Sequence, residues 1–259
     1  MAHGCLTLPP VNVTSSTPKS VAKATMSTLL VSGFVLAGPA LPANADETDP
    51  PDCTKVDCVA LTFDDGPGEH TDRLLDILGE HDAKATFYLL GSQVDEYKDE
   101  VKRMVVEGHE IGSHSWEHAD LTTLSTDEIE DDLDRTDKAI NNIIGKDPTT
   151  VRPPYGALND TVRQAVDHPI VLWDVDTLDW QHHNGDKIVD IAGNETSPGS
   201  VLLLHDIHKT TVDAVPAVLE TLSEDDYEFV TIGDLFQEDL EPGTVYSDAR
   251  SEYTEQSGD

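Results

Sequence analysis

Two neighbouring carboxylates, Asp64 and Asp65, follow an apolar segment at residues 59–63 and precede the turn residues Gly66 and Pro67. Adjacent carboxylates repel one another unless a cation lies close by. With a cation present, one carboxylate can serve as a metal ligand and the other as a base. Taken alone, the Asp-Asp-Gly-Pro pattern is also typical of a polar turn.

Two histidines four residues apart, His114 and His118, are the second candidate. This spacing places both rings on one face of a helical turn, where they suit a divalent transition metal. The acid Glu117 does not directly follow the first histidine, so the pattern differs from the metalloprotease motif. A pair of surface histidines is the alternative interpretation.

Arg152 begins the sequence Arg-Pro-Pro-Tyr-Gly, and the two prolines fix an extended segment from which a guanidinium can meet a carboxylate. Residues 173–180 carry two tryptophans and three acids, and aromatic rings of this kind stack on sugars. A surface ion pair and ordinary core packing are the respective alternatives, and for Trp173 we favour the core. His205 ends an apolar run at residues 202–204, where a lone histidine is more often structural than catalytic.

Short apolar runs alternate with amphipathic segments, which predicts a parallel α/β sheet or barrel. The strongest helix is expected over residues 126–144, where Ser125 and Glu128 form a capping box and Gly145 ends the helix. Further helices are expected at residues 72–78, 97–107, 158–166 and 212–222. Strands are expected at residues 59–63, 85–89, 149–151, 170–173, 201–204 and 229–232. Each candidate motif then lies at the end of a strand, where barrels carry their chemistry.

Together, in this order, the five motifs resemble one family, the polysaccharide deacetylases (carbohydrate esterase family four), over about residues 56–236. The resemblance implies a distorted (β/α) barrel and a hydrolase that removes acetyl groups from a polysaccharide. It makes Asp65, His114 and His118 the ligands of a divalent metal, with zinc preferred. Asp64 corresponds to the base that takes a proton from the attacking water, and His205 to the general acid.

The resemblance also assigns supporting residues. Arg152 would orient the base, and Asp179 would hold the general acid and raise its pKa, with Asp176 as the second candidate. The backbone N–H of Tyr155 would help to stabilise the oxyanion. Two side chains would line the acetyl pocket, namely Trp180 and Leu203.

Residues 1–45 are expected to be a signal peptide, because they contain no acidic residue and carry an apolar run at residues 29–37 before the small-x-small sequence Ala43-Asn44-Ala45. An uncleaved membrane anchor is disfavoured, since glycines and prolines interrupt the apolar run. Residues 46–52 are expected to be a linker, 53–236 the catalytic domain, and 237–259 an acidic, poorly ordered extension. These features predict a secreted, extracellular protein without stable membrane insertion after cleavage.

Cys53 and Cys58 are expected to form a disulfide in an oxidising compartment. A zinc pair is the alternative, but the only other cysteine lies in the expected signal peptide. The formal net charge of −35 argues against nucleic acid and anionic lipid as partners. The charge suits either simple solubility or adaptation to high salt.

The expected partner is an acetylated polysaccharide, with N-acetylglucosamine units of chitin-like glycans or peptidoglycan as the preferred target and a monomer as the expected state. An O-acetyl esterase acting on xylan is the first alternative. A non-catalytic glycan-binding protein on the same fold is the second, although such a protein would be expected to have lost a ligand or the base.

Overall fold

The central strands form from apolar sequence that is buried on both faces. In the computed structural model, which describes residues 50–237 and 240–250, all seven residues of β1 (Cys58–Asp64) are buried. The strands β2 (Ala85–Leu89) and β6 (Val201–His205) flank β1, and β3 (Glu110–Ser113) and β5 (Val175–Asp176) continue the sheet. The order is β3-β2-β1-β6-β5, and all these pairs are parallel.

Short links extend this row of strands beyond β3. Val151 forms parallel bridges to both Ser113 and Ile170, so it joins β3 to β4 (Ile170–Val171). Beside β4 runs β8 (Val245–Tyr246), and β7 (Glu228–Phe229) pairs with the start of β1. The result is the distorted α/β barrel that the sequence predicts.

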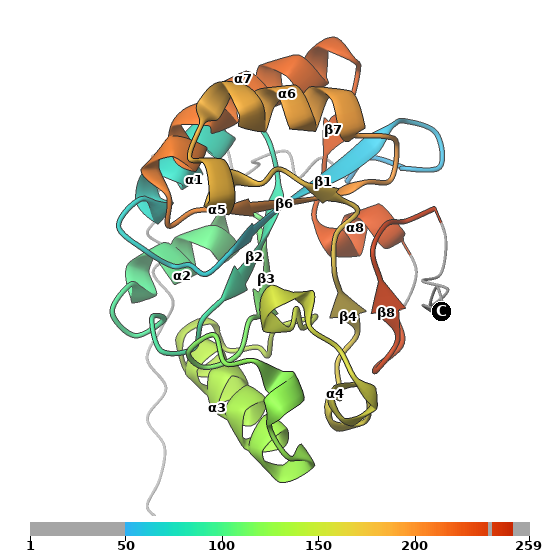
Figure 1. The fold of residues 1–259 in the computed structure, drawn as a ribbon. Helices are drawn as coiled ribbons and strands as arrows, with labels where there is room; N and C mark the ends of the chain where they lie inside the picture. Colours follow the sequence, from blue (N-terminus) through green and yellow to red (C-terminus); the bar gives the residue numbers. More distant parts are fainter. Residues whose placement is uncertain (1–49, 238–239, 251–259) are drawn as a thin grey trace, which may run out of the picture. The chain divides into compact units, whose positions relative to one another are not determined.

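Helices cover the outside of the strands (Figure 1). They are α1 (Thr71–Glu80), α2 (Lys98–Val106), α3 (Thr126–Ile144), α4 (Asp160–Ala165), α5 (Asp179–His182), α6 (Gly185–Glu195), α7 (Lys209–Glu224) and α8 (Ile232–Phe236). Successive helices pack on one another: α1 contacts α2 and α7, α2 contacts α3, α3 contacts α4, and α6 lies along α7. The expected bounds of α3 are confirmed, with its capping box and a left-handed Gly145 at its end.

Two expectations about the C-terminal part are wrong. The strand expected at residues 229–232 ends at Phe229, because the Thr231 side chain accepts a hydrogen bond from Asp234 N–H and caps α8. The expected disorder from Gln237 onward is wrong for residues 240–250, since β8 pairs with β4 and Arg250 pairs with Asp174. The folded part therefore extends past Phe236 to at least Arg250. Residues 1–49, with the expected signal peptide and most of the linker, lie outside the described residues.

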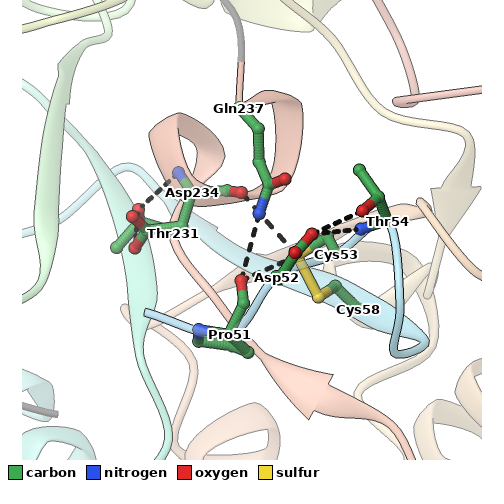
Figure 2. The surroundings of a disulfide bond; sticks show 8 residues. All are labelled: Pro51, Asp52, Cys53, Thr54, Cys58, Thr231, Asp234 and Gln237. Carbon is green, nitrogen blue, oxygen red and sulfur yellow. Dashed lines mark hydrogen bonds between the residues drawn. A yellow bond between two sulfur atoms is a disulfide. The ribbon is translucent and has the colours of Figure 1, made fainter. Parts of the chain in front are cut away.

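The expected disulfide between Cys53 and Cys58 is present, and it fastens the segment before β1 to the first residue of that strand (Figure 2). The same segment also contacts the end of α8, where the side-chain amide of Gln237 donates to the carbonyl of Pro51 at 3.1 Å. Among the helices that the structure describes, none has the length and apolar character needed to cross a bilayer.

Candidate active site

The polar motifs meet at the carboxyl ends of the parallel strands. Asp64 is the last residue of β1, and His205 is the last residue of β6. His114 directly follows β3, and Arg152 follows the bridging residue Val151. Asp64, His114 and His205 line one cavity of about 420 Å³. Arg152 is not part of the lining, but it donates a hydrogen bond to Asp64.

Asp65, His114 and His118 converge on one point. Asp65 Oδ1 lies 3.5 Å from His114 Nε2 and 3.3 Å from His118 Nε2. Ligand atoms held ~2.1 Å from a tetrahedral zinc ion are themselves ~3.4 Å apart, so these separations are those of a metal-binding triad. Asp65 Oδ1 is also buried without a hydrogen-bond partner among the described residues, which is the situation of a ligand atom. The three side chains fit a divalent ion.

The surroundings of His114 prepare it to act as a ligand. Its Nδ1 lies 2.6 Å from the carbonyl oxygen of Arg152, so Nδ1 carries the proton and Nε2 presents its lone pair to Asp65 and His118. The ring is 2% exposed, and burial lowers its pKa despite the nearby charges of Asp64 and Asp65. The neutral ring is the form that binds a metal.

Arg152 is fully buried and holds Asp64 in place. Its Nη1 donates to Asp64 Oδ1 and to the Thr62 hydroxyl, each at 2.7 Å. The remaining guanidinium donors bond the carbonyls of Val171 and Leu172 at 2.9 and 2.7 Å. Because every donor group is occupied by a fixed partner, the Asp64 carboxylate has one well-defined orientation at the cavity wall.

His205 and Asp179 form the second oriented pair. Asp179 is fully buried, and its Oδ1 accepts from His205 Nδ1 at 2.8 Å, while Oδ2 accepts from the His205 N–H and the Thr211 hydroxyl. Burial opposes a charge on His205, but the hydrogen bond and charge of Asp179 outweigh it and raise the pKa of His205 to about 9. Burial likewise opposes ionisation of Asp179, yet the hydrogen bond from His205 outweighs it and lowers the Asp179 pKa. His205 Nε2 is left to act as a proton donor.

Comparison with known proteins agrees with this geometry. Residues 52–168 match the polysaccharide deacetylase family. A solved structure described as T48 deacetylase with substrate is 49% identical, has a TM-score of 0.74, and covers 76% of this chain and 99% of its own. The chain belongs to the polysaccharide deacetylase family.

Two further relatives show the range of this family. The peptidoglycan-N-acetylglucosamine deacetylase PgdA of Listeria monocytogenes is 42% identical over 209 residues, which cover 80% of this chain but only 45% of the relative. A family 4 acetyl xylan esterase from Clostridium thermocellum, solved with a cobalt ion, is 33% identical with a TM-score of 0.72, covering 75% of this chain and all of that one. The chain therefore spans less than half the length of its Listeria relative.

The cavity wall contains Trp180 and Leu203, the two side chains expected there, and also the side chain of Tyr155, for which only a backbone role was expected. Trp180 and Tyr155 are among the exposed large side chains. Tyr155 has a left-handed backbone (φ 62°) in the turn Pro154–Gly156, and its ring packs against that of His118 with 4.4 Å between centroids. Two exposed aromatic side chains beside the polar groups of the same cavity suit a sugar ring.

Three residues at or beside the cavity have surroundings that the sequence did not reveal. Trp173 lines the cavity and is only partly buried, so the core role that we favoured for it is incomplete. Asp176 also lines the cavity, but its carboxylate accepts from Leu178 N–H and is not the His205 partner. Asp206 is fully buried beside His205, and burial raises its pKa to about 7 against the effect of a hydrogen bond from Thr71. The position of Asp206 after a catalytic candidate was the one signal available for it.

Proposed function

We propose that this protein is a secreted, metal-dependent deacetylase that hydrolyses N-acetyl groups on N-acetylglucosamine units of a polysaccharide. One observation carries the proposal. A metal-binding triad, an oriented carboxylate and an oriented imidazole with a raised pKa all face the same aromatic-walled cavity. No group that the chemistry requires is missing from this cavity, which disfavours the non-catalytic glycan-binding alternative.

Asp65, His114 and His118 would hold a divalent ion, for which zinc is our preferred candidate because tetrahedral nitrogen and oxygen ligation suits it. Such an ion supplies Lewis-acid activation of the attacking water and of the acetyl carbonyl. Cobalt accompanies a relative in its solved structure and is an alternative to zinc.

Asp64 is proposed to accept a proton from the attacking water, because Arg152 fixes its carboxylate at the cavity wall next to the triad. The Tyr155 N–H is the backbone donor proposed to stabilise the developing oxyanion. His205 then donates the proton on Nε2 to the leaving nitrogen and becomes neutral, while its Nδ1–H stays hydrogen-bonded to Asp179, which keeps the ring oriented. The methyl group of the acetyl would pack against Leu203 and Trp180.

Peptidoglycan or a chitin-like glycan is the proposed substrate class. The name of the Listeria relative specifies N-acetylglucosamine of peptidoglycan, and it matches most of this chain. An amine leaving group also needs full protonation, which His205 is equipped to supply. Similarity to an acetyl xylan esterase makes O-acetyl xylan the second candidate. Secretion is supported by the Cys53–Cys58 disulfide, since such bonds persist in oxidising compartments.

Acetate release tests the proposal. The protein would be given N-acetylglucosamine oligomers, peptidoglycan and acetylated xylan, each with added zinc and with chelator. Chelator-sensitive acetate release from the first two, exceeding that from xylan, is expected. Release from xylan alone would replace the proposed substrate with the second candidate. If zinc binds and no acetate is released from any of the three, the enzyme assignment fails in favour of glycan binding.

A further inference from the structure

Asp206 is a buried carboxyl that the proposed chemistry does not use. It directly follows His205 at the end of β6 and is fully buried, and it is absent from the lining of the catalytic cavity. Its Oδ1 has no hydrogen-bond partner among the described residues. A buried polar atom without a hydrogen bond costs free energy, so the other contacts of this side chain are informative.

The other oxygen of Asp206 holds the start of α1. Oδ2 accepts a hydrogen bond from the hydroxyl of Thr71, the first residue of that helix, which is also fully buried. The same hydroxyl oxygen accepts from Gly68 N–H at 2.8 Å. Two hydrogen bonds through the Thr71 hydroxyl therefore connect Asp206, after the end of β6, to Gly68 in the turn that follows Asp65.

Gly66 brings that turn directly against the carboxyl. A Cβ atom built on Gly66 would lie 2.7 Å from Asp206 Oδ2 and 2.9 Å from its Cγ, closer than real Cβ atoms approach other atoms. The Asp206 side chain thus occupies the space that only glycine leaves open. The carbonyl of Gly66 also accepts a hydrogen bond at 2.8 Å from the N–H of Leu90, the residue that follows β2.

We propose that Asp206 is a positioning residue for the metal site, which fixes the turn of residues 65–68 against the end of β6. This inference rests on the proposed function and deepens it. Asp65 presents its ligand oxygen from a left-handed backbone conformation (φ 70°), one that an unsupported chain leaves readily. The Asp206 carboxyl and the Leu90 N–H support the turn from two sides. The distance between Asp65, which directly follows β1, and His205 at the end of β6 is then set by a contact between their neighbours Gly66 and Asp206.

Zinc affinity separates this role from a general contribution to stability. Residues that orient ligands typically change metal affinity by about 10–100-fold when they are removed. D206A is expected to weaken zinc binding within that range and to alter the visible absorption of the cobalt-substituted protein, which reports ligand geometry. D206N keeps the shape of the side chain and an oxygen that can accept from Thr71. Because the proposed role depends on the position of the side chain and not on its charge, D206N is expected to bind zinc with near wild-type affinity.

Thr71 provides a second and milder pair of variants. T71V removes the hydroxyl that links Asp206 to Gly68, and T71S retains it, so T71V should weaken zinc binding while T71S should not. The double variant T71V/D206A should bind zinc no more weakly than D206A alone, because the two side chains act through one bond. L222A is the matched control, since Leu222 is fully buried near the far end of α7 from His205. It should lower Tm and leave zinc affinity unchanged.

The outcomes distinguish failure of the positioning role of Asp206 from failure of the proposed function. Zinc would be titrated into each metal-free variant against a chelator of known affinity, and acetate release would be measured on the wild type. A wild type that binds zinc and releases acetate, together with D206A and T71V at wild-type zinc affinity, would overturn the positioning role alone. A loss of affinity in L222A equal to that in D206A would overturn it as well. A wild type that binds no zinc would overturn both the inference and the proposed function.

Discussion

Asp64 and His205 are partners in the register of the parallel strands β1 and β6. Each is the final residue of its strand, and paired positions of neighbouring strands direct their side chains to the same face of a sheet. The proposed base and acid therefore enter the cavity from adjacent positions of two neighbouring strands of the sheet. Each is then held by a residue from another segment, Asp64 by Arg152 and His205 by Asp179.

Asp64→Asn should separate metal binding from catalysis. Asp64 Oδ2 lies 3.7 Å from His114 Nε2 and is not one of the three converging ligands, so the variant should retain zinc. Loss of a general base should lower kcat by at least ~100-fold. Zinc content after dialysis and acetate release from N-acetylglucosamine oligomers would be measured together, with Asp65→Asn as the control that loses the metal. Turnover near wild type in Asp64→Asn would reject its assignment as the base.

The activity of the enzyme should fall as the pH rises through the pKa of His205. Burial lowers that pKa, but the hydrogen bond and charge of Asp179, together with the charges of Asp64 and Asp65, outweigh burial and raise it from 6.5 to about 9. The proton needed by the leaving group is therefore present at neutral pH. The positive charge of a bound metal ion would move this limb to lower pH. In Asp179→Asn the ion pair is lost and burial dominates, so the alkaline limb should move toward or below pH 6.5. An unchanged pH profile of kcat/KM in that variant would contradict the pairing.

The same pair also links stability to pH. A group whose pKa is raised by folding stabilises the folded state fully below its unfolded value and loses this effect as the pH passes its folded value. For His205 the contribution is complete below about pH 6.5 and disappears as the pH rises through about 9. The difference in unfolding free energy between wild type and Asp179→Asn should therefore be larger at pH 6 than at pH 9.5.

Arg152 should matter for stability as well as for activity. Replacing it with leucine leaves the buried Asp64 charge unpaired and removes the donors to the carbonyls of Val171 and Leu172. Breaking a buried ion pair in this way costs about 3–5 kcal/mol of unfolding free energy. Arg73→Ala is the matched control, because its pair with Asp213 is solvent-exposed and such pairs contribute about 0–1 kcal/mol. Equal losses of unfolding free energy in the two variants, measured by urea unfolding, would contradict the expected contribution of Arg152 to stability.

Features controlled by neighbouring residues could be predicted from the sequence. The helix α3 has its expected bounds because Ser125, Glu128 and Gly145 act within a few residues of its ends. The start of α8 carried a similar local signal, Thr231 followed three residues later by Asp234, which we interpreted wrongly as part of a strand. The convergence of the motifs also followed, because parallel strands end at a common edge.

Features that depend on distant segments could not be predicted. The strand β8 is two residues long within an acidic stretch, and it exists because β4, more than seventy positions earlier, offers a pairing edge. The contact of Asp206 with Gly66 likewise joins two strand ends that lie far apart in the sequence. The roles of the site residues came from family resemblance, since residue types and spacing alone do not distinguish a base from a ligand.

Salt should stabilise this protein, because its net charge of −35 makes the folded state repel itself. Glu130, Asp131 and Asp134 of α3 line one hollow together with Asp137 and Asp167, and Glu130 and Asp134 are four residues apart on the helix. Like charges at that spacing cost about 0.2–0.5 kcal/mol per pair. The screening length falls from about 10 Å at 0.1 M salt to about 3 Å at 1 M, so the repulsion weakens steeply over this range.

Tm is therefore expected to rise between 0.1 and 2 M sodium chloride, concentrations at which the screening length is about 10 Å and then below about 3 Å. The variant Glu130→Gln/Asp131→Asn should have a higher Tm than wild type at low salt, and the difference should vanish at high salt, because screening then already removes the repulsion that the substitutions relieve. Lys55→Gln is a control that removes an exposed positive charge and should act in the opposite direction. A Tm that is independent of salt, or a stabilisation by the double substitution that persists at 2 M, would show that the acidic surface serves solubility and is not an adaptation to salt.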